Sequence, residues 1–214
     1  MVFEFMNRVT LASVAAASFF FAGVAFCQQE AHRTGLEQNL VREPVPAGVL
    51  AAAVPAVQEL GNLFLQKKYQ EVVDKTYPRM LKKMAKREPG GEAAVMARLQ
   101  KRIAEVDNLG VTLLSFEALP AINGLDIPEN KEWLVVVPIR QVMSGVDPET
   151  GKIVKVEIRS FQLAICTKDG AEWSFLTGSN TEVSELRTYF SSMPRDFGDW
   201  ALPKVTERVL PEGQ

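Results

Sequence analysis

The stretch that decides the fold is "GKIVKVEIRSFQLAICTKDGAEWSFLTGS", residues 151–179. From Val154 to Ile158 its apolar side chains occupy the even positions, which is typical of a β-strand with one buried face. From Phe161 to Ile165 they occupy the odd positions instead. Because a β-bulge inserts one extra residue and reverses the parity of everything after it, this change predicts a bend within a long hairpin.

The preceding strand, "EWLVVVPIRQVM" at residues 132–143, supplies a second sign of a bend. If the hairpin closes symmetrically around "SGVDPETG", Pro138 lies close to Ile158, where the parity changes. A proline cannot donate to the backbone ladder, so in sheets it is found at edges or bulges. The parity change and Pro138 therefore predict a single event, a curl in the sheet.

The second hairpin turns at "TKDGAEW" and has two candidate registers. A two-residue turn at Asp169 and Gly170 would place Trp173 beside Cys166, whereas a three-residue turn would place it beside Ile165. Burial of one face decides the register of a strand. The sequence therefore favours the three-residue turn, with Gly170 in the left-handed conformation.

Helical patterns come before the sheet. Apolar residues recur at helical spacing from residue 47 onward, and Pro78 is expected to break the second helix because it lacks a backbone N–H. Residues 92–109 carry the most regular pattern, and Gly110 follows as a natural C-terminal cap. Its apolar stripe consists of Val95, Leu99, Ile103 and Val106.

The remaining segments complete the predicted fold. Residues 111–119 predict a strand and residues 120–131, rich in turn formers, a loop. Ser179 is expected to cap a short helix that contains Leu186. Residues 193–214 are expected to form an extended tail. The predicted fold class is α+β, with N-terminal helices packed on a curved four-stranded antiparallel sheet.

The N-terminus has the layout of a secretory signal. Arg8 precedes an uncharged run that ends in small residues before Gln28. We therefore expect a signal peptide at residues 1–27, a flexible tether at 28–46 and one domain at 47–214, with export to the periplasm or medium. Lipidation at Cys27 and an uncleaved membrane anchor are the alternatives.

Composition narrows the function classes. The chain of 214 residues is 47% hydrophobic and 23% charged, which suits a globular protein. A formal net charge of −2 argues against general binding to nucleic acid phosphates, and no membrane contact is expected after signal cleavage. The mature chain keeps one cysteine, Cys166, so it cannot form an internal disulfide. We expect Cys166 to be a small buried hydrophobe.

Three motifs give the chain a resemblance to a known family. They are "YQEVVDKTYPRML" at residues 69–81, "NLGV" at 108–111 and "DGAEWSFL" at 169–176. From residue 56 to 178 the chain resembles the nuclear transport factor 2-like (SnoaL-like) superfamily, and is most similar to small exported bacterial members with no assigned activity. The resemblance implies a cone-shaped α+β fold. It does not imply one function, because that fold hosts dehydratases, isomerases, transport factors and binding modules.

Signatures of catalysis are scarce. Enzymes of that superfamily usually hold an Asp or Tyr with a His inside the cone, but the one histidine here, His32, falls in the predicted tether. The sequence has no cysteine and histidine pattern with zinc spacing, no phosphate-binding glycine loop and no Gly-x-Ser-x-Gly elbow. We therefore predict neither a metal nor a cofactor.

Five residues are candidates for a ligand site: Asp74, Tyr77, Trp133, Arg140 and Gln162. Asp74 and Tyr77 lie three positions apart on one helical face, where a carboxylate and a phenol could bind or protonate a ligand. The alternative, which we favour, is that Tyr77 packs in the core with its hydroxyl satisfied while Asp74 faces water. Trp133 is likewise expected to be a core aromatic rather than a stacking platform.

Three function classes remain. The preferred one is an exported non-catalytic module that binds a small apolar ligand or a partner protein through an outer sheet face carrying Ser160, Gln162 and Ala164. The second is an enzyme of the isomerase or dehydratase kind that uses Asp74 and Tyr77. The third is a structural protein that self-associates, as a homodimer, through its sheet.

Overall fold

The computed structural model describes residues 43–108, 110–147, 150–170, 172–177 and 182–211. The predicted signal peptide, most of the tether, Cys27, His32 and Ser179 lie outside these residues. The helices are α2 Ala47–Leu65, α3 Tyr69–Asp74, α4 Pro78–Ala85, α5 Gly91–Asn108, α6 Val183–Leu186 and α7 Phe197–Ala201. The strands are β1 Thr112–Ala118, β2 Asn123–Ile127, β3 Glu132–Val146, β4 Ile153–Thr167, β5 Trp173–Thr177 and β6 Thr206–Leu210.

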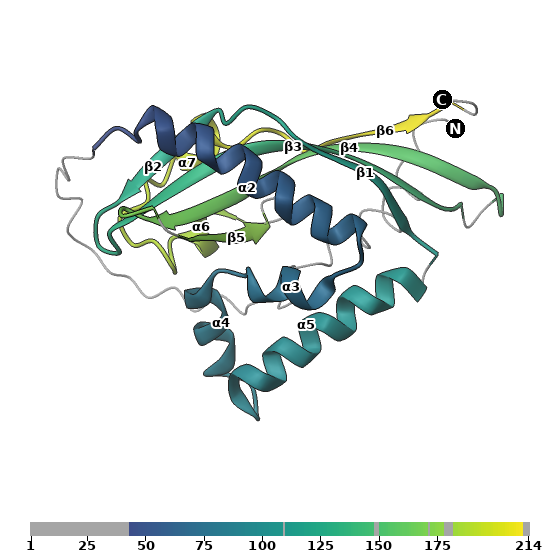
Figure 1. Ribbon diagram of the computed structural model, residues 1–214, viewed down its shortest axis with the longest axis horizontal. Coiled ribbons are helices and arrows are strands. Elements are labelled where there is room, and N and C mark those ends of the chain that lie inside the picture. Colours follow the sequence, from purple (N-terminus) through teal and green to yellow (C-terminus); the bar gives the residue numbers. More distant parts are fainter. Residues whose placement is uncertain (1–42, 109, 148–149, 171, 178–181, 212–214) are drawn as a thin grey trace.

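The strands form one antiparallel sheet with the order β1-β3-β4-β5, to which β2 adds beside β3 and β6 beside β4. The predicted α+β class is confirmed, but the predicted number of four strands is wrong, since six form within the described residues. The two missed strands fall in the segments predicted as a loop, which contains β2, and as a tail, which contains β6. Helix α2 crosses the sheet. Helices α3, α4 and α5 lie beyond the edge of the sheet that β5 forms, where Thr76 bridges to Phe175 (Figure 1).

The long hairpin is unbroken. β3 and β4 pair at every position from Glu132 opposite Thr167 to Val146 opposite Ile153, and Pro138 faces Phe161 rather than Ile158. The predicted bulge in this hairpin is therefore wrong. The observed register shift lies in β1, between Leu113 and Ser115.

Pro138 occupies a position where a backbone donor is not needed. Its carbonyl accepts a hydrogen bond from the Leu119 N–H at 2.8 Å, so its backbone edge faces away from β4. β1 ends at Ala118 and β2 begins at Asn123, which leaves a gap in the strands along this edge of β3. The missing N–H falls at that gap, where it costs no ladder bond.

The parity change in β4 reflects two different layers rather than a bend. Even positions such as Ala164 pack in one cluster with Val57 of α2. Odd positions from Phe161 onward, including Leu163, pack in a second cluster with Phe190 in the C-terminal segment. In the first half of β4 the apolar side chains pack on the even face, with Val156 and Ile158 beside Met143. The apolar pattern changes because the C-terminal layer begins at Phe161.

The same double burial explains the error in the second register. Trp173 pairs with Cys166 and Phe175 with Ala164, which is the register of the rejected two-residue turn. Ile165 and Cys166 are 1% and 2% exposed, on opposite faces. Burial therefore does not distinguish the two registers at this end of the strand.

The helical predictions agree better with the structure. α5 buries Val95, Leu99 and Ile103, and Gly110 follows it with a φ of 71°. α4 begins at Pro78, where a proline is tolerated because the first helical N–H has no intrahelical partner. Among the described helices α2 is long and apolar enough to cross a membrane, with a mean hydropathy of 1.4, but a core helix of a soluble protein has the same character.

Candidate functional site

The structure does not bring the five predicted site residues together. Asp74 is exposed at the end of α3, where its carboxylate accepts a hydrogen bond from Gln70 Nε2 at 2.7 Å. Tyr77 is 1% exposed. The expectation that both share a helical face fails because α3 ends at Asp74 and α4 begins only at Pro78. The intervening residues bond to Phe175 of β5, which turns Tyr77 inward while Asp74 stays in solvent.

Tyr77 is held in the core by a small polar network. Its hydroxyl donates to Glu132 Oε2 at 2.8 Å and accepts from Asn130 Nδ2 at 3.4 Å. Its ring lies 5.3 Å from that of Phe190. Burial, and then the hydrogen bond to Glu132, raise the pKa of Tyr77 far above its usual range, so the phenol stays protonated. This is the arrangement of a core tyrosine with its hydroxyl satisfied.

We expect Tyr77 to stay protonated in the native protein at an alkaline pH that ionises an exposed tyrosine. Its folded-state pKa lies above the unfolded value of about 10, so its stabilising effect is complete below pH about 10 and is lost as the pH rises further. Burial also raises the pKa of Tyr189, to about 12. Absorbance titration of tyrosinate should therefore show a step that coincides with unfolding and whose amplitude falls by one tyrosine in Tyr77→Phe. A Tyr77→Phe titration identical to that of the parent would contradict this assignment.

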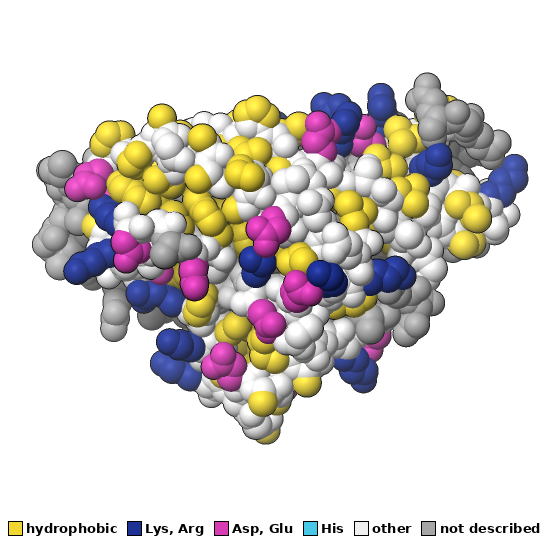
Figure 2. Space-filling model, in the orientation of Figure 1, with side chains coloured by type: hydrophobic (Ala, Val, Ile, Leu, Met, Phe, Trp, Pro, Cys, Tyr) yellow, Lys and Arg dark blue, Asp and Glu magenta, His cyan; other side chains and the backbone are white. Residues whose placement is uncertain are grey.

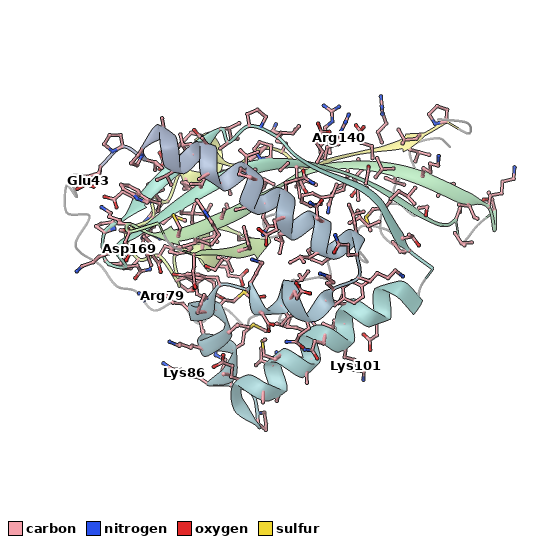
Figure 3. The ribbon with its side chains drawn as sticks, in the orientation of Figure 1. Glu43, Arg79, Lys86, Lys101, Arg140 and Asp169 are labelled. Atoms are coloured by element: carbon pink, nitrogen blue, oxygen red, sulfur yellow. The ribbon has the colours of Figure 1, made fainter. Side chains whose placement is uncertain are left out.

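Trp133 belongs to a structural cluster at one end of the sheet. It is 5% exposed, and Lys168 Nζ lies 4.5 Å from its ring centroid. The same ammonium group is 3.0 Å from Asp126 Oδ1 and 3.0 Å from Glu43 Oε2, while the Glu43 N–H donates to Asp126 Oδ2 at 3.2 Å. Glu43 lies at the same end of the molecule as Asp169 (Figure 3). The cluster fixes the entry of the N-terminal chain, and Val45 packs over Gly124 beside it.

Gln162 is buried on the α2 side of the sheet. Its side-chain Nε2 donates to the Leu176 carbonyl at 2.7 Å, which satisfies an amide that is 6% exposed. Ser160 and Ala164, on the same face, are 5% and 0% exposed. The prediction that these three residues form an outer, accessible face is therefore wrong, because helix α2 and the neighbouring strands cover that side of β4.

Arg140 is the one exposed member of the five besides Asp74, and it belongs to a charged row on the opposite face. Its guanidinium pairs with Glu117 of β1. Next to it, Arg159 of β4 lies 3.1 Å from Glu157, whose other oxygen is 3.9 Å from Arg208 of β6. Acidic and basic side chains lie side by side along the upper rim, where Arg140 is found (Figure 2; Figure 3). Glu117, Arg140, Glu157, Arg159 and Arg208 are here called the charged row.

Two edges of the sheet are partly covered by hydrogen bonds from neighbouring segments. At β1, Gln58 of α2 donates to the Phe116 carbonyl at 3.1 Å and accepts from the Ala118 N–H at 2.9 Å. At β5, the Phe175 N–H donates to the Lys75 carbonyl at 2.9 Å and its carbonyl accepts from the Tyr77 N–H at 3.0 Å. At Phe116, Ala118 and Phe175 these contacts occupy backbone groups that an added strand would need.

The outer edge of β6 is different. β6 pairs with β4 on one side, and among the described residues no backbone group pairs with its other side. Thr206, Arg208 and Val209 are exposed, and β6 lies at the end of the sheet that α2 does not reach (Figure 1). Sequence reasoning missed this strand. The available signal was a short run with β-branched residues between Pro203 and Pro211.

Other chemistry-bearing groups do not assemble in the described part of the chain. No group of three or more His, Cys, Asp or Glu side chains there could hold a metal ion. Cys166 is free and 2% exposed, and burial raises the pKa of its thiol to about 11. Its predicted role as a small buried hydrophobe is confirmed, since the reactive thiolate is disfavoured.

Comparisons with protein-family models, with curated proteins and with solved structures find no match for this chain.

Proposed function

We propose that the chain is an exported, non-catalytic binding module that takes a partner protein at the open edge of β6. The observation that carries the proposal is the contrast between edges. Gln58 bonds to the outer side of β1, the α3–α4 connection bonds to that of β5, and Val45 packs over Gly124 of β2. Among the described residues no backbone group pairs with the outer side of β6. Strand addition to an exposed edge is a recurring mode of protein recognition. The family we propose remains the nuclear transport factor 2-like superfamily, and the α+β layout of helices on an antiparallel sheet supports it.

The outward-facing backbone groups of β6 follow from the ladder. In antiparallel strands successive residues direct their N–H and C=O to alternate sides. The carbonyls of Val136 and Pro138 accept bonds from the β1–β2 side, so the backbone groups of the odd residues of β3 bond to β4. These odd residues pair with even residues of β4. The backbone groups of the odd residues of β4 therefore face β5 and β6. Thr206, Arg208 and Leu210 therefore bond to β4, and Glu207 and Val209 present their N–H and C=O outward.

The alternatives have less support. An isomerase or dehydratase built on Asp74 and Tyr77 needs both groups at one ligand, but Asp74 is exposed and the Tyr77 hydroxyl is engaged with Glu132. The small-ligand version of the binding module was expected to use Gln162, which is buried with its amide bonded to Leu176.

The test is a pair of variants at one residue. Val209→Pro removes an outward N–H and leaves the β4-facing bonds of Thr206, Arg208 and Leu210 in place, whereas Val209→Thr changes the side chain and keeps the N–H. We expect a partner captured from the exported fraction of the source cells by the parent and by Val209→Thr to be lost with Val209→Pro. Equal capture by all three chains, or none by the parent, would refute the proposal.

A further inference from the structure

The open edge of β6 carries side-chain information besides its backbone groups. Thr206, Arg208 and Leu210 project on the face of the charged row, and Glu207 and Val209 project on the other face. An added strand would place one side chain opposite each of these. The pattern on β6 therefore determines which extended segments suit the edge.

A second copy of the chain suits it poorly. Two identical antiparallel strands related by a two-fold axis place one residue opposite itself. Pairing all five residues of β6 centres the register on Arg208 and sets Arg208 against Arg208. A register centred on Glu207 sets Glu207 against Glu207. Like charges directly opposite are destabilising. A register centred on Val209 sets Pro211, which has no N–H, against the outward groups of Glu207.

The charged row leaves a basic group at the edge. Arg140 has Glu117 as its own partner, but Glu157 serves both Arg159, at 3.1 Å, and Arg208, at 3.9 Å. The carboxylate of Glu157 is nearer Arg159, and the Arg208 side chain is 68% exposed on the outermost strand. An acidic side chain opposite Arg208 would complete the row on that face.

The other face calls for different side chains. Glu207 lies beside Ile158 and Val209 beside Val156, so an acidic and an apolar residue follow each other along the edge. Val209 is 47% exposed. A basic residue opposite Glu207 and an apolar residue opposite Val209 would match them.

We infer that β6 binds an extended antiparallel segment of a partner protein that reads, from its N-terminus, apolar, acidic, basic, opposite Val209, Arg208 and Glu207. This inference rests on the proposed function and names the partner's chemistry. The antiparallel direction follows the rest of the sheet and the slightly greater stability of antiparallel pairs. In this direction each side chain of the segment stands directly opposite one side chain of β6.

Two synthetic peptides of the same composition test it. Both have glycine and serine flanks, one with the core Leu-Val-Glu-Lys-Thr and the other with Leu-Val-Lys-Glu-Thr. We expect the full chain to bind the first peptide about tenfold more tightly at low ionic strength, since two cross-strand charge pairs change sign between them. Fluorescence anisotropy of labelled peptides gives both affinities.

A charge exchange on the protein is the matched control. In the double variant Glu207→Lys/Arg208→Glu the preference between the peptides should reverse. Equal affinity of the two peptides for the parent, or a preference that the double variant leaves unchanged, would overturn the inference without touching the capture result for Val209→Pro. Concentration-dependent dimers in sedimentation, lost in Val209→Pro, would overturn it in favour of a second copy at the same edge.

Discussion

Replacement of Phe190 by alanine is expected to lower the free energy of unfolding by about 3–5 kcal/mol. Phe190 is 0% exposed and, with Met193, packs in one cluster with Leu163 on the odd face of β4. Its ring also lies 5.3 Å from that of Tyr77. Removing the ring leaves a cavity between the sheet and the C-terminal segment, which close-packed neighbours refill only in part. Urea denaturation followed by circular dichroism measures the loss.

An exposed aromatic in the same segment provides the control. Trp200 is 48% exposed and touches Phe197 edge-on, with ring centroids 5.3 Å apart. We expect Trp200→Ala to cost less than about 1.5 kcal/mol, since about half of the residue is already exposed to water and its truncation leaves no closed cavity. If Trp200→Ala destabilises the protein as much as Phe190→Ala, the C-terminal segment does not form a packed second layer.

That second layer marks the limit of what the β4 pattern could reveal. A change in apolar parity has two causes, an inserted residue or burial of both faces, and the sequence of one strand does not distinguish them. Here residues from Phe161 onward are covered on both sides, by α2 and by the segment that contains Phe190. The segment that contains Phe190 comes after β5 in the sequence, and its apolar pattern is too short to predict that it packs on the odd face of β4.

Local signals predicted the helices because their causes are local. Pro78 starts α4, and the stripe of Val95, Leu99 and Ile103 faces the core, as expected from geometry within one helix. Strands β2 and β6 were missed because each consists of five residues that are ordered by a neighbour far away in sequence. β6 pairs with residues about 50 positions earlier, which no window of local sequence contains.

The candidate site shows the same division. The spacing of Asp74 and Tyr77 implied a shared face only while the helix was assumed to be continuous. Pro78 in the sequence already indicates that the helix is interrupted. The burial of Tyr77 in the core, however, depends on its bonds with Phe175 and Glu132, which are distant in sequence. The open edge of β6 was invisible for a different reason. Whether an edge strand is free depends on the whole sheet, because it depends on distant contacts such as those of Gln58 with β1 and of Lys75 with β5.

Gly61→Ala is expected to lower the free energy of unfolding by about 3 kcal/mol, against the usual preference of helices for alanine. Gly61 lies inside α2, where alanine would ordinarily be more favourable by about 1 kcal/mol. A Cβ at this position would stand 2.0 Å from Cδ1 and 2.3 Å from Cγ of Phe116. Because Cγ is bonded to the Cβ of a strand residue, the ring cannot move aside without shifting β1 from Gln58.

The same helix contains the control. Gly48, in the first turn of α2, has no atom within 4 Å of the Cβ that alanine would add, so Gly48→Ala should be neutral or stabilise the protein by up to about 1 kcal/mol. A substitution of Phe116, the residue that the added Cβ would meet, tests whether the clash is the cause. If the clash with the ring causes the loss, Phe116→Leu should cost less in the Gly61→Ala background than in the parent, a coupling visible in a double-mutant cycle. Additive losses would mean that Gly61 is needed for a reason other than the approach of α2 to Phe116.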